Sequence, residues 1–334
     1  MKENHLALYR KYRPQTFSDV VGQEQIVELL TSSIKQKKIG HAYMFCGSRG
    51  TGKTTVARIF AHDIGCNPED IIEIDAASNR GIDEIRELRE AVRTAPFSSP
   101  FKVYIVDEAH MLTKEAANAL LKTLEEPPSH IVFILATTDP NKLPQTIISR
   151  CQTINFKQPD NKTLADRLIY ITEKEGSSIT NESAELIARH SMGSYRDAIG
   201  ILEQILTTGG KKIKDEDVTL FLGAPEQELL ISLLESVCLK DGKKVLEITA
   251  KLHINNSSAI KTYDEFIEIL RQGLIIRVGE NTETKSEISR LATQYPHTIG
   301  SKTILELLEK RYLLEVSDIH SWTAFRAILL SIIE

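Results

Sequence analysis

The stretch GSRGTGKT at residues 47–54 decides the fold, because it satisfies the phosphate-loop pattern G-x-x-x-x-G-K-[ST] at every fixed position. The apolar run AYMF at 42–45 precedes it, and the helical pattern TVARIFAHDI at 55–64 follows it. In such a strand–loop–helix, backbone N–H groups and a helix N-terminus face the phosphates of a nucleoside triphosphate. The sequence therefore predicts a nucleotide site. The alternative is a glycine-rich turn with an incidental lysine, which the flanking strand and helix disfavour.

The residue types within this loop suit a metal-bound triphosphate. Lys53 is expected to reach the β- and γ-phosphates, and the Thr54 hydroxyl is expected to help hold Mg²⁺. The predicted nucleotide contacts are the loop residues and the one that follows them: Gly47, Ser48, Arg49, Gly50, Thr51, Gly52, Lys53, Thr54 and Thr55.

Two carboxylates follow the apolar run VYIV at 103–106. In a parallel sheet they would lie at the carboxyl edge of a buried strand, beside the phosphate loop. Asp107 suits the shell of Mg²⁺, and Glu108 suits activation of an attacking water. The alternative is that one carboxylate merely caps the next helix. His110 is expected to pack or bond locally rather than to catalyse.

Composition limits the classes that the chain can belong to. Its 334 residues suggest two or three domains, and 41% hydrophobic with 26% charged residues is globular usage. The chain has 41 Lys plus Arg and 46 Asp plus Glu, so its net charge is −5. This excludes a protein that binds nucleic acid through its overall charge. The chain has no apolar run of about 20 residues, no signal-like N-terminus and no C-x-x-C pair among its four cysteines. We expect a reduced, cytoplasmic protein.

Alternating strand and helix patterns occupy residues 1–157, which predicts a parallel sheet covered by helices. Thr113 is the predicted N-cap of a helix that ends before Pro127. Beyond Asp160, apolar residues recur at helical spacing, so the fold class is α/β plus all-α. The predicted strands are Tyr43–Cys46, Ile71–Asp75, Val103–Asp107, Ile131–Ala136 and Thr153–Phe156.

On these motifs, the sequence resembles the gamma/tau family of subunits of the bacterial DNA polymerase III clamp loader. Members of this family are AAA+ ATPases. The resemblance runs almost continuously from residue 7 to about 205, and beyond that only the helical pattern and position match the family's collar domain. It implies an AAA+ P-loop domain at 1–157, a helical lid at 158–222 and a helical collar at 223–334. The blocks that carry it are YRKYRPQTFSDVVGQE (9–24), EIDAASNRGIDEIREL (73–88), KVYIVDEAHMLTKEAANALLKTLEEPP (102–128), LATTDPNKLPQTIISRCQ (135–152) and GSYRDAIGILEQ (193–204).

The resemblance also implies roles for residues outside the phosphate loop. Thr138, or its neighbour Thr137, falls at the sensor-1 position near the γ-phosphate, with a solvated threonine as the alternative. Arg150 resembles an arginine finger for the ATP of a neighbouring subunit, and a surface salt bridge is its alternative. Arg196 matches sensor 2, or is a solvated helix arginine. The segment expected against the adenine contributes Tyr9, Arg10, Pro14, Val20 and Val21.

The family reading implies ATP and Mg²⁺ as cofactors and a ring of subunits as the working form. Its expected partners are other gamma/tau copies, the delta and delta-prime subunits, the beta sliding clamp and primer–template DNA. DNA contacts should be sparse and directed at phosphates, with solvated polar faces as the alternative for each residue. Two other functions stay open: a delta-prime-like scaffold that donates Arg150, and another AAA+ machine such as a branch-migration helicase. The expected DNA contacts are Arg80, Arg86, Lys122 and Thr146.

Two features depart from the family pattern. The family usually carries a zinc-binding cysteine cluster after the phosphate-loop helix, but here Cys66 stands alone before NPEDIIEID. One thiolate cannot build a tetrahedral site, so we predict no zinc. The sequence also ends at Glu334 without a Pro/Ala-rich linker and tail, which leads us to expect a short, gamma-like form.

Overall fold

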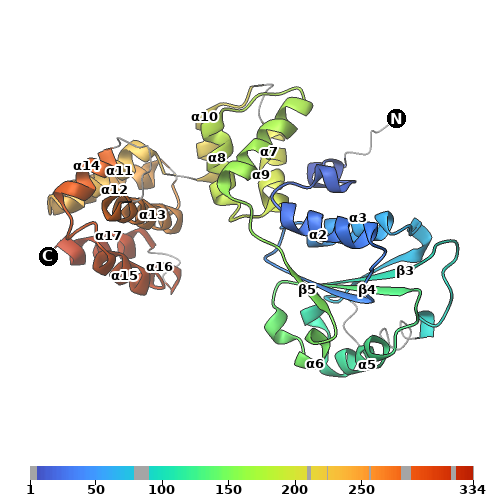
Figure 1. The fold of residues 1–334 in the computed structure, drawn as a ribbon. Coiled ribbons are helices and arrows are strands. Elements are labelled where there is room, and N and C mark those ends of the chain that lie inside the picture. The colour runs from blue at the N-terminus through green and yellow to red at the C-terminus, as the bar shows by residue number, and fades with distance from the viewer. Residues whose placement is uncertain are drawn as a thin grey trace. The chain divides into compact units, whose positions relative to one another are not determined.

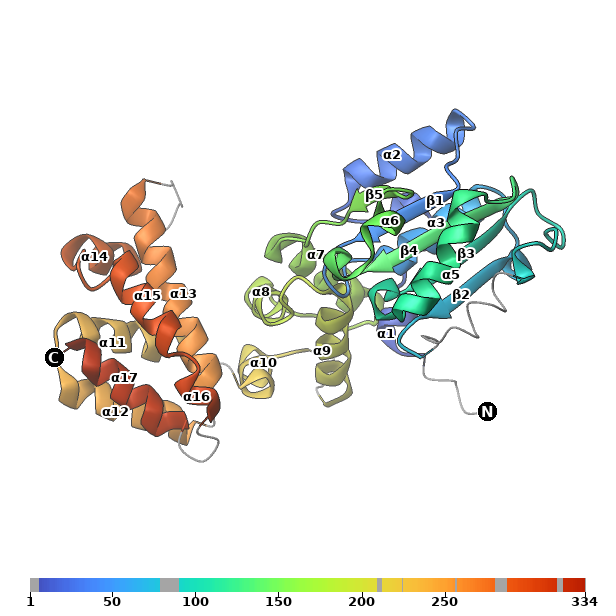
Figure 2. The same ribbon diagram turned by 90° about the horizontal axis from the view of Figure 1, so that it is seen from below.

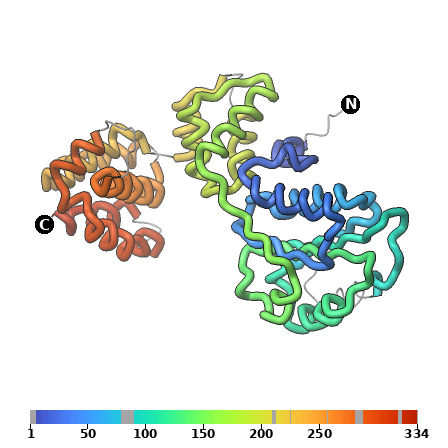
Figure 3. The backbone as a smooth tube through the Cα atoms, viewed as in Figure 1, coloured from blue at the N-terminus to red at the C-terminus, as the bar shows by residue number. Residues whose placement is uncertain are grey.

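A computed structural model describes residues 6–78, 90–208, 212–223, 225–255, 257–279, 287–316 and 321–333. The chain forms two compact units, Met1–Ile213 and Lys214–Glu334. Figures 1 and 3 show the course of the chain, coloured by residue number. The expected further division at residues 157 and 222 stays a prediction. Among the described residues, no helix is long and apolar enough to span a membrane.

A five-stranded parallel sheet forms the centre of the first unit (Figure 2). Its strand order is β2-β3-β4-β1-β5, so β1 lies between β4 and β5. All five expected strands are confirmed, with no end moved by more than one residue. The bounds are β1 (Ala42–Cys46), β2 (Ile71–Asp75), β3 (Lys102–Asp107), β4 (Ile131–Thr137) and β5 (Gln152–Asn155).

Helices cover both faces of the sheet, which explains why β3 and β4 are continuously apolar. On one face, Val103 and Ile105 of β3 pack with α2 (Glu24–Lys35) and α3 (Lys53–Asp63). On the other, Tyr104 and Val106 pack with α5 (Lys114–Glu125), and α6 (Gln145–Ile148) adds to the same cluster (Figure 1). Thr113 caps α5 by accepting the N–H of Ala116, as predicted. The carboxyl ends of β1 and β3 therefore carry the two predicted motifs at one edge.

Four more α-helices are described in the first unit. The short α1 (Leu8–Lys11) contacts α9, and α7, α8 and α9 pack on one another. Asp160 accepts the N–H of Thr163 to cap α7, and Thr180 caps α8 in the same way. The bounds are α7 (Asn161–Lys174), α8 (Asn181–His190) and α9 (Tyr195–Thr208). We refer to α7–α9 as the lid helices.

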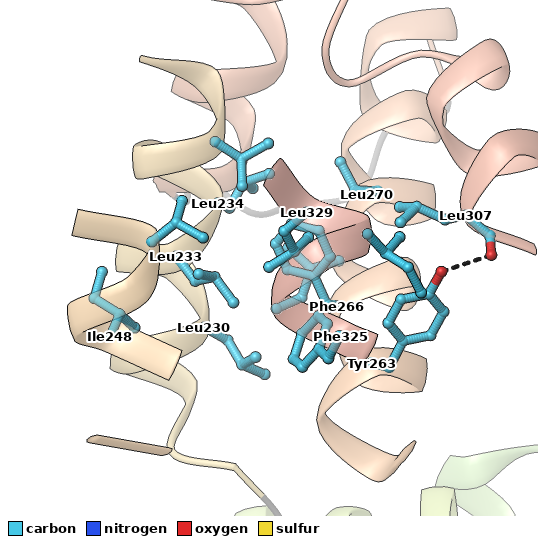
Figure 4. Packing of buried hydrophobic residues seen from close by; sticks show 14 of the residues in the cluster. Leu230, Leu233, Leu234, Ile248, Tyr263, Phe266, Leu270, Leu307, Phe325 and Leu329 are labelled. Atoms are coloured by element: carbon cyan, nitrogen blue, oxygen red, sulfur yellow. Dashed lines mark hydrogen bonds between the residues drawn. The ribbon is translucent and has the colours of Figure 1, made fainter. Parts of the chain in front are cut away.

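Every element described in the second unit is a helix, as the periodicity predicted. Phe266, Phe325 and Leu329 lie in its core, and the buried hydroxyl of Tyr263 donates a 2.6 Å hydrogen bond to the carbonyl of Leu307 (Figure 4). The bounds are α10 (Asp215–Leu222), α11 (Gln227–Cys238), α12 (Gly242–Ile254), α13 (Ala259–Val278), α14 (Glu287–Gln294), α15 (Ser301–Lys310), α16 (Leu313–Val316) and α17 (Ser321–Ile333).

Candidate nucleotide-binding site

The phosphate-loop motif joins β1 to α3 through a left-handed turn. Gly50 has φ of 74° and Gly52 has φ of 100°, a region where a side chain would strain the backbone. Gly52 is the N-cap of α3, so the first N–H groups of this helix lie at the end of the loop. The hydroxyl of Thr51 closes the turn by donating to the Ser48 carbonyl at 2.9 Å.

Lys53 is buried at the base of this loop, with only 6% of its surface exposed. Its ammonium donates to the carbonyl oxygens of Gly47 and Ser48, each at 2.8 Å. Burial lowers the pKa of Lys53, while the nearby carboxylates of Glu108 and Asp107 act in the opposite direction. A buried ammonium held by neutral carbonyls fits an anionic ligand such as a phosphate, whose charge would offset the desolvation.

A hydroxyl and a carboxylate meet beside the lysine. The Thr54 hydroxyl donates to Oδ2 of Asp107 at 2.8 Å, and the backbone N–H of Glu108 donates to Oδ1 at 3.0 Å. Oxygen donors of this kind are those that Mg²⁺ prefers, with waters and phosphate oxygens completing its octahedron. The described residues include no group of three or more His, Cys, Asp or Glu that could hold a metal ion. Thr54 and Asp107 therefore fit Mg²⁺ bound jointly with phosphates, rather than a cage made by protein alone.

Glu108 follows Asp107 in an uncommon backbone conformation. Its φ of 48° and ψ of 44° are left-handed, which for a residue with a side chain stores local strain of about 1–3 kcal/mol. The Glu108 carboxylate accepts a 3.3 Å hydrogen bond from the Thr138 hydroxyl, and His110 Nδ1 lies 3.4 Å from the same oxygen. His110 thus bonds locally, as expected: its Nδ1 hydrogen bonds with the Thr137 hydroxyl at 3.1 Å, and it lies beside the carboxylate predicted to activate water.

A pocket of about 970 Å³, a volume that includes space open to solvent, lies beside these groups. It is bounded by the N-terminal segment, the loop, the two carboxylates and the lid helices. Residues expected from the sequence that line it are Tyr9, Pro14, Val20, Val21, Arg49, Gly50, Thr51, Gly52, Lys53, Thr54, Thr55, Asp107, Glu108 and Arg196. Arg10 is not in this lining; its guanidinium lies 5.7 Å from the centre of the Tyr9 ring. Gly47 and Ser48 contribute the carbonyl oxygens that accept hydrogen bonds from the Lys53 ammonium.

The lid helices meet the loop and the N-terminal segment at this pocket. The N–H of Tyr195 donates to the Gly50 carbonyl at 3.0 Å, and the Arg196 guanidinium lies 5.9 Å from the centre of the Tyr9 ring. A Cβ at Gly50 would lie 2.0 Å from Oγ of Ser194, so only glycine permits this approach. The sequence therefore needs glycine at this variable position of the motif for packing as well as for φ.

Other pocket residues were not expected from the sequence. Arg13 and Tyr195 lie within the stretches that carried the family resemblance, so proximity to Pro14 and Arg196 was a usable signal. Arg167 lies on a helix without any motif, and it donates to the Tyr12 carbonyl at 2.8 Å. No pattern in the sequence could have found it. The pocket residues not expected are Tyr12, Arg13, Asp19, Val56, Arg167, Tyr195 and Ile199.

Arg150, Lys122 and Thr146 do not line the pocket. Arg150 pairs with Glu125 at 2.7 Å, and its guanidinium also donates to the Thr146 carbonyl at 2.8 Å. The salt bridge named as the alternative is thus present in the single chain. The side chains of Lys122 and Thr146 are exposed on α5 and α6. Arg80 and Arg86 lie outside the described residues.

Cys66 lies where the family carries its zinc-binding cysteine cluster. Cys66 is buried, its thiol donates to the Phe101 carbonyl at 3.2 Å, and burial raises its pKa to about 11. A protonated, buried thiol is a poor metal ligand. The nearby Asp70 carboxylate accepts backbone N–H groups of Phe97 and Ser98, at 2.6 and 3.1 Å. Protein hydrogen bonds therefore hold this part of the fold.

Comparisons with known proteins identify the family. A family model described as "DNA polymerase III, delta subunit" matches residues 22–78 and 67–160. The tau subunit of DNA polymerase III from Bacillus subtilis is 39% identical over 330 residues, which cover 92% of this chain and 59% of that protein. The corresponding tau subunit of Escherichia coli is 37% identical, and the chain spans 45% of its length. The chain thus covers about half of these curated relatives.

A shorter relative and a solved structure complete the comparison. The gamma subunit of DNA polymerase III from Buchnera aphidicola (subspecies Acyrthosiphon pisum) is 37% identical, covering 80% of this chain and 79% of that protein. The RuvB Holliday junction branch migration motor of Thermotoga maritima superposes with a TM-score of 0.53 at 21% identity, over 68% of this chain and 79% of that one. That likeness concerns the fold, which is of the AAA+ ATPase type. The chain therefore belongs to the gamma/tau family of DNA polymerase III subunits.

Proposed function

We propose that this chain is the ATP-hydrolysing motor subunit of a clamp loader, which uses ATP to place the beta sliding clamp on primed DNA. The observation that carries the proposal is the convergence of a buried lysine, a hydroxyl and a carboxylate at one sheet edge. Lys53 lies under the phosphate loop, and Thr54 hydrogen bonds to Asp107. A structural loop would have no use for a buried cation with an oxygen-ligand pair beside it.

In this proposal each side chain has a separate task in phosphoryl transfer. Lys53 binds the β- and γ-phosphates, and Thr54 and Asp107 hold Mg²⁺, which when bound neutralises charge on the phosphate oxygens. Glu108 accepts a proton from the attacking water, and Thr138 orients the Glu108 carboxylate through the 3.3 Å hydrogen bond between them. The pocket segment with Tyr9, Pro14, Val20 and Val21 receives the adenine.

Arg196 and Arg150 connect the nucleotide to other parts of the assembly. Arg196 connects the lid helices to the bound nucleotide, and its 5.9 Å approach to the Tyr9 ring already brings it to the pocket. Arg150 is absent from that pocket, which suits a guanidinium that serves the ATP of a neighbouring subunit. Its present bond to Glu125 would be exchanged for phosphate oxygens in the ring. Each site would then be completed only on assembly.

The partners follow from the family and are likewise proposals. The ring would contain other gamma/tau copies with the delta and delta-prime subunits, act in the cytoplasm, and engage the beta clamp and primer–template DNA. Exposed Lys122 and Thr146 are our candidates for phosphate contacts, together with Arg80 and Arg86. We also propose three domains, namely an AAA+ domain at 1–157, a lid at 158–222 and a collar at 223–334.

The test is ATP hydrolysis by the reconstituted complex with clamp and primed DNA, comparing wild type with Lys53→Ala and with Lys142→Ala, an exposed lysine outside the pocket. We expect Lys53→Ala to abolish hydrolysis and clamp loading, and Lys142→Ala to retain both. Strand displacement by this chain alone, without clamp loading, would instead favour a branch-migration motor.

A non-hydrolysing scaffold like delta-prime is the second candidate, and the match of residues 22–160 to a family model described as a delta subunit favours it. Wild-type protein that assembles and loads clamps with no change on Lys53→Ala would support the scaffold. Against it stand the intact Lys53, Thr54, Asp107 and Glu108, since a scaffold needs none of the four.

A further inference from the structure

His110 is a motif residue that the proposed chemistry has not used. It lies in the short 3₁₀ helix η3 (Ala109–Met111) that follows the two carboxylates, and its side chain is only 10% exposed. Its Nδ1 lies 3.1 Å from the hydroxyl of Thr137 and 3.4 Å from Oε2 of Glu108. One ring nitrogen therefore faces two oxygens, from the end of β4 and from the predicted base.

The chemistry of these two oxygens decides where the imidazole proton resides. The Glu108 carboxylate can only accept, so a lone pair on Nδ1 would face it repulsively at this distance. The Thr137 oxygen is fully buried and accepts the N–H of Asp139 at 3.1 Å, and it can accept from the imidazole too. The arrangement is thus satisfied when Nδ1 carries the proton and donates it to Thr137, with the same N–H edge of the ring turned toward Glu108.

The contacts with His110 and Thr138 engage only one of the two carboxylate oxygens of Glu108. Oε2 accepts from the Thr138 hydroxyl at 3.3 Å and lies beside His110 Nδ1. No hydrogen bond or ion pair within the described part of the chain engages Oε1, which can then accept a proton from water. Glu108 has a left-handed backbone conformation and lies outside a regular helix or strand. Without these two contacts, no regular element would support its side chain.

We propose that His110 is a positioning residue for ATP hydrolysis: its Nδ1–H, bonded to the Thr137 hydroxyl at the end of β4, lies 3.4 Å from Oε2 of Glu108 and attracts that carboxylate into place. This inference rests on the proposed function. The imidazole does not touch substrate; it acts through Glu108, and the buried Thr137 hydroxyl fixes the ring. Because general-base catalysis depends on geometry before basicity, losing this contact with Glu108 should reduce turnover rather than nucleotide binding.

Two amide substitutions separate this role from simple packing. His110→Asn places an amide N–H near the position of Nδ1, whereas His110→Gln places it near Nε2, out of reach of Glu108. In the reconstituted complex with clamp and primed DNA, we expect His110→Gln to lower kcat on the order of tenfold, with KM and the affinity for a fluorescent ATP analogue within about twofold of wild type. His110→Asn should retain kcat within about threefold of wild type.

A double-mutant cycle with Glu108→Gln tests whether the effect passes through Glu108. We expect His110→Gln to have little further effect in that background. Equal losses for Asn and Gln, a rise in KM with unchanged kcat, or additive losses in the cycle would overturn the inference. Should His110→Gln fail to fold, Thr137→Val removes the hydroxyl that fixes the ring, and a wild-type kcat for it would overturn the inference as well.

The two proposals fail in different ways. If the wild-type complex hydrolyses ATP and Lys53→Ala does not, the motor function holds, and a wild-type rate for His110→Gln defeats only the positioning role. If the wild-type complex hydrolyses nothing, the motor function itself fails and the role of His110 falls with it.

Discussion

The Tyr195 hydroxyl, at the start of α9, donates a 2.9 Å hydrogen bond to the carbonyl oxygen of Val21 in the N-terminal segment. The backbone N–H of the same tyrosine donates to Gly50 in the phosphate loop. One residue of the lid helices therefore bonds to both the segment expected at the adenine and the loop expected at the phosphates. Burial raises the pKa of the Tyr195 phenol to about 12, so it remains a donor at every physiological pH.

Tyr195→Phe should weaken ATP binding about three- to tenfold, because it removes one hydrogen bond worth about 1 kcal/mol while keeping the ring. Tyr170→Phe, on the exposed side of α7, is the matched control and should bind ATP normally. Affinity can be measured by calorimetry for ATP and for tripolyphosphate. Equal loss for both ligands would contradict the idea that Tyr195 acts through the adenine segment.

Arg150→Ala should leave nucleotide binding unchanged and reduce hydrolysis by the assembled ring on the order of 10³-fold, as for other arginines supplied by a neighbour. Arg290→Ala is the control, since this exposed arginine also pairs with a glutamate, at 3.3 Å. The loss of the exposed Arg150–Glu125 pair should cost under about 1 kcal/mol of stability. An equal fall in the activity of the isolated chain would argue against action across an interface.

Asp70→Asn should lower the stability of the first unit by about 2 kcal/mol at neutral pH, since two backbone N–H groups lose a charged acceptor. Burial alone would raise the pKa of Asp70, but the hydrogen bonds from Phe97, Ser98 and Ser99 outweigh it, so the pKa lies below its ordinary value. The contribution of Asp70 is therefore complete above about pH 4 and is lost as the pH falls through the lowered pKa.

Thermal unfolding of wild type and Asp70→Asn at several pH values checks this. The difference between their unfolding temperatures should be largest near neutral pH and shrink in acid. Asp63→Asn, an exposed carboxylate on the end of α3, should show no such difference. A gap that is constant with pH would mean that the side-chain amide, and not the lost charge, is responsible.

Tyr263→Phe should destabilise the second unit by about 1–2 kcal/mol, because it leaves the Leu307 carbonyl without its buried donor. Trp322 is the only tryptophan in the sequence and belongs to the same core, so its fluorescence reports unfolding of this unit in urea. The control is Tyr312→Phe, whose ring is 60% exposed. Identical urea midpoints for the two variants would refute the assignment.

The elements predictable from sequence were those with strong local signals. The apolar runs of β3 and β4 are buried on both faces, and Thr113 caps its helix, so pattern and structure coincide. The phosphate loop was equally predictable, because its glycines and its lysine belong to one short, contiguous motif. Arg167 was not predicted, since its place at the pocket depends on how the lid helices pack, which no short motif records. Tyr195 was missed although its neighbour Arg196 in the block at 193–204 was a usable signal.

The contact between Gly50 and the lid has a mechanical consequence. With the Tyr195 N–H on the Gly50 carbonyl and Ser194 seated where a Cβ would be, this peptide cannot shift without pushing or pulling α9. A displacement of the Gly50 peptide would therefore be passed to the start of α9 through this hydrogen bond and the Ser194 contact. A side chain at position 50 would clash with Ser194 and would separate the phosphate loop from α9.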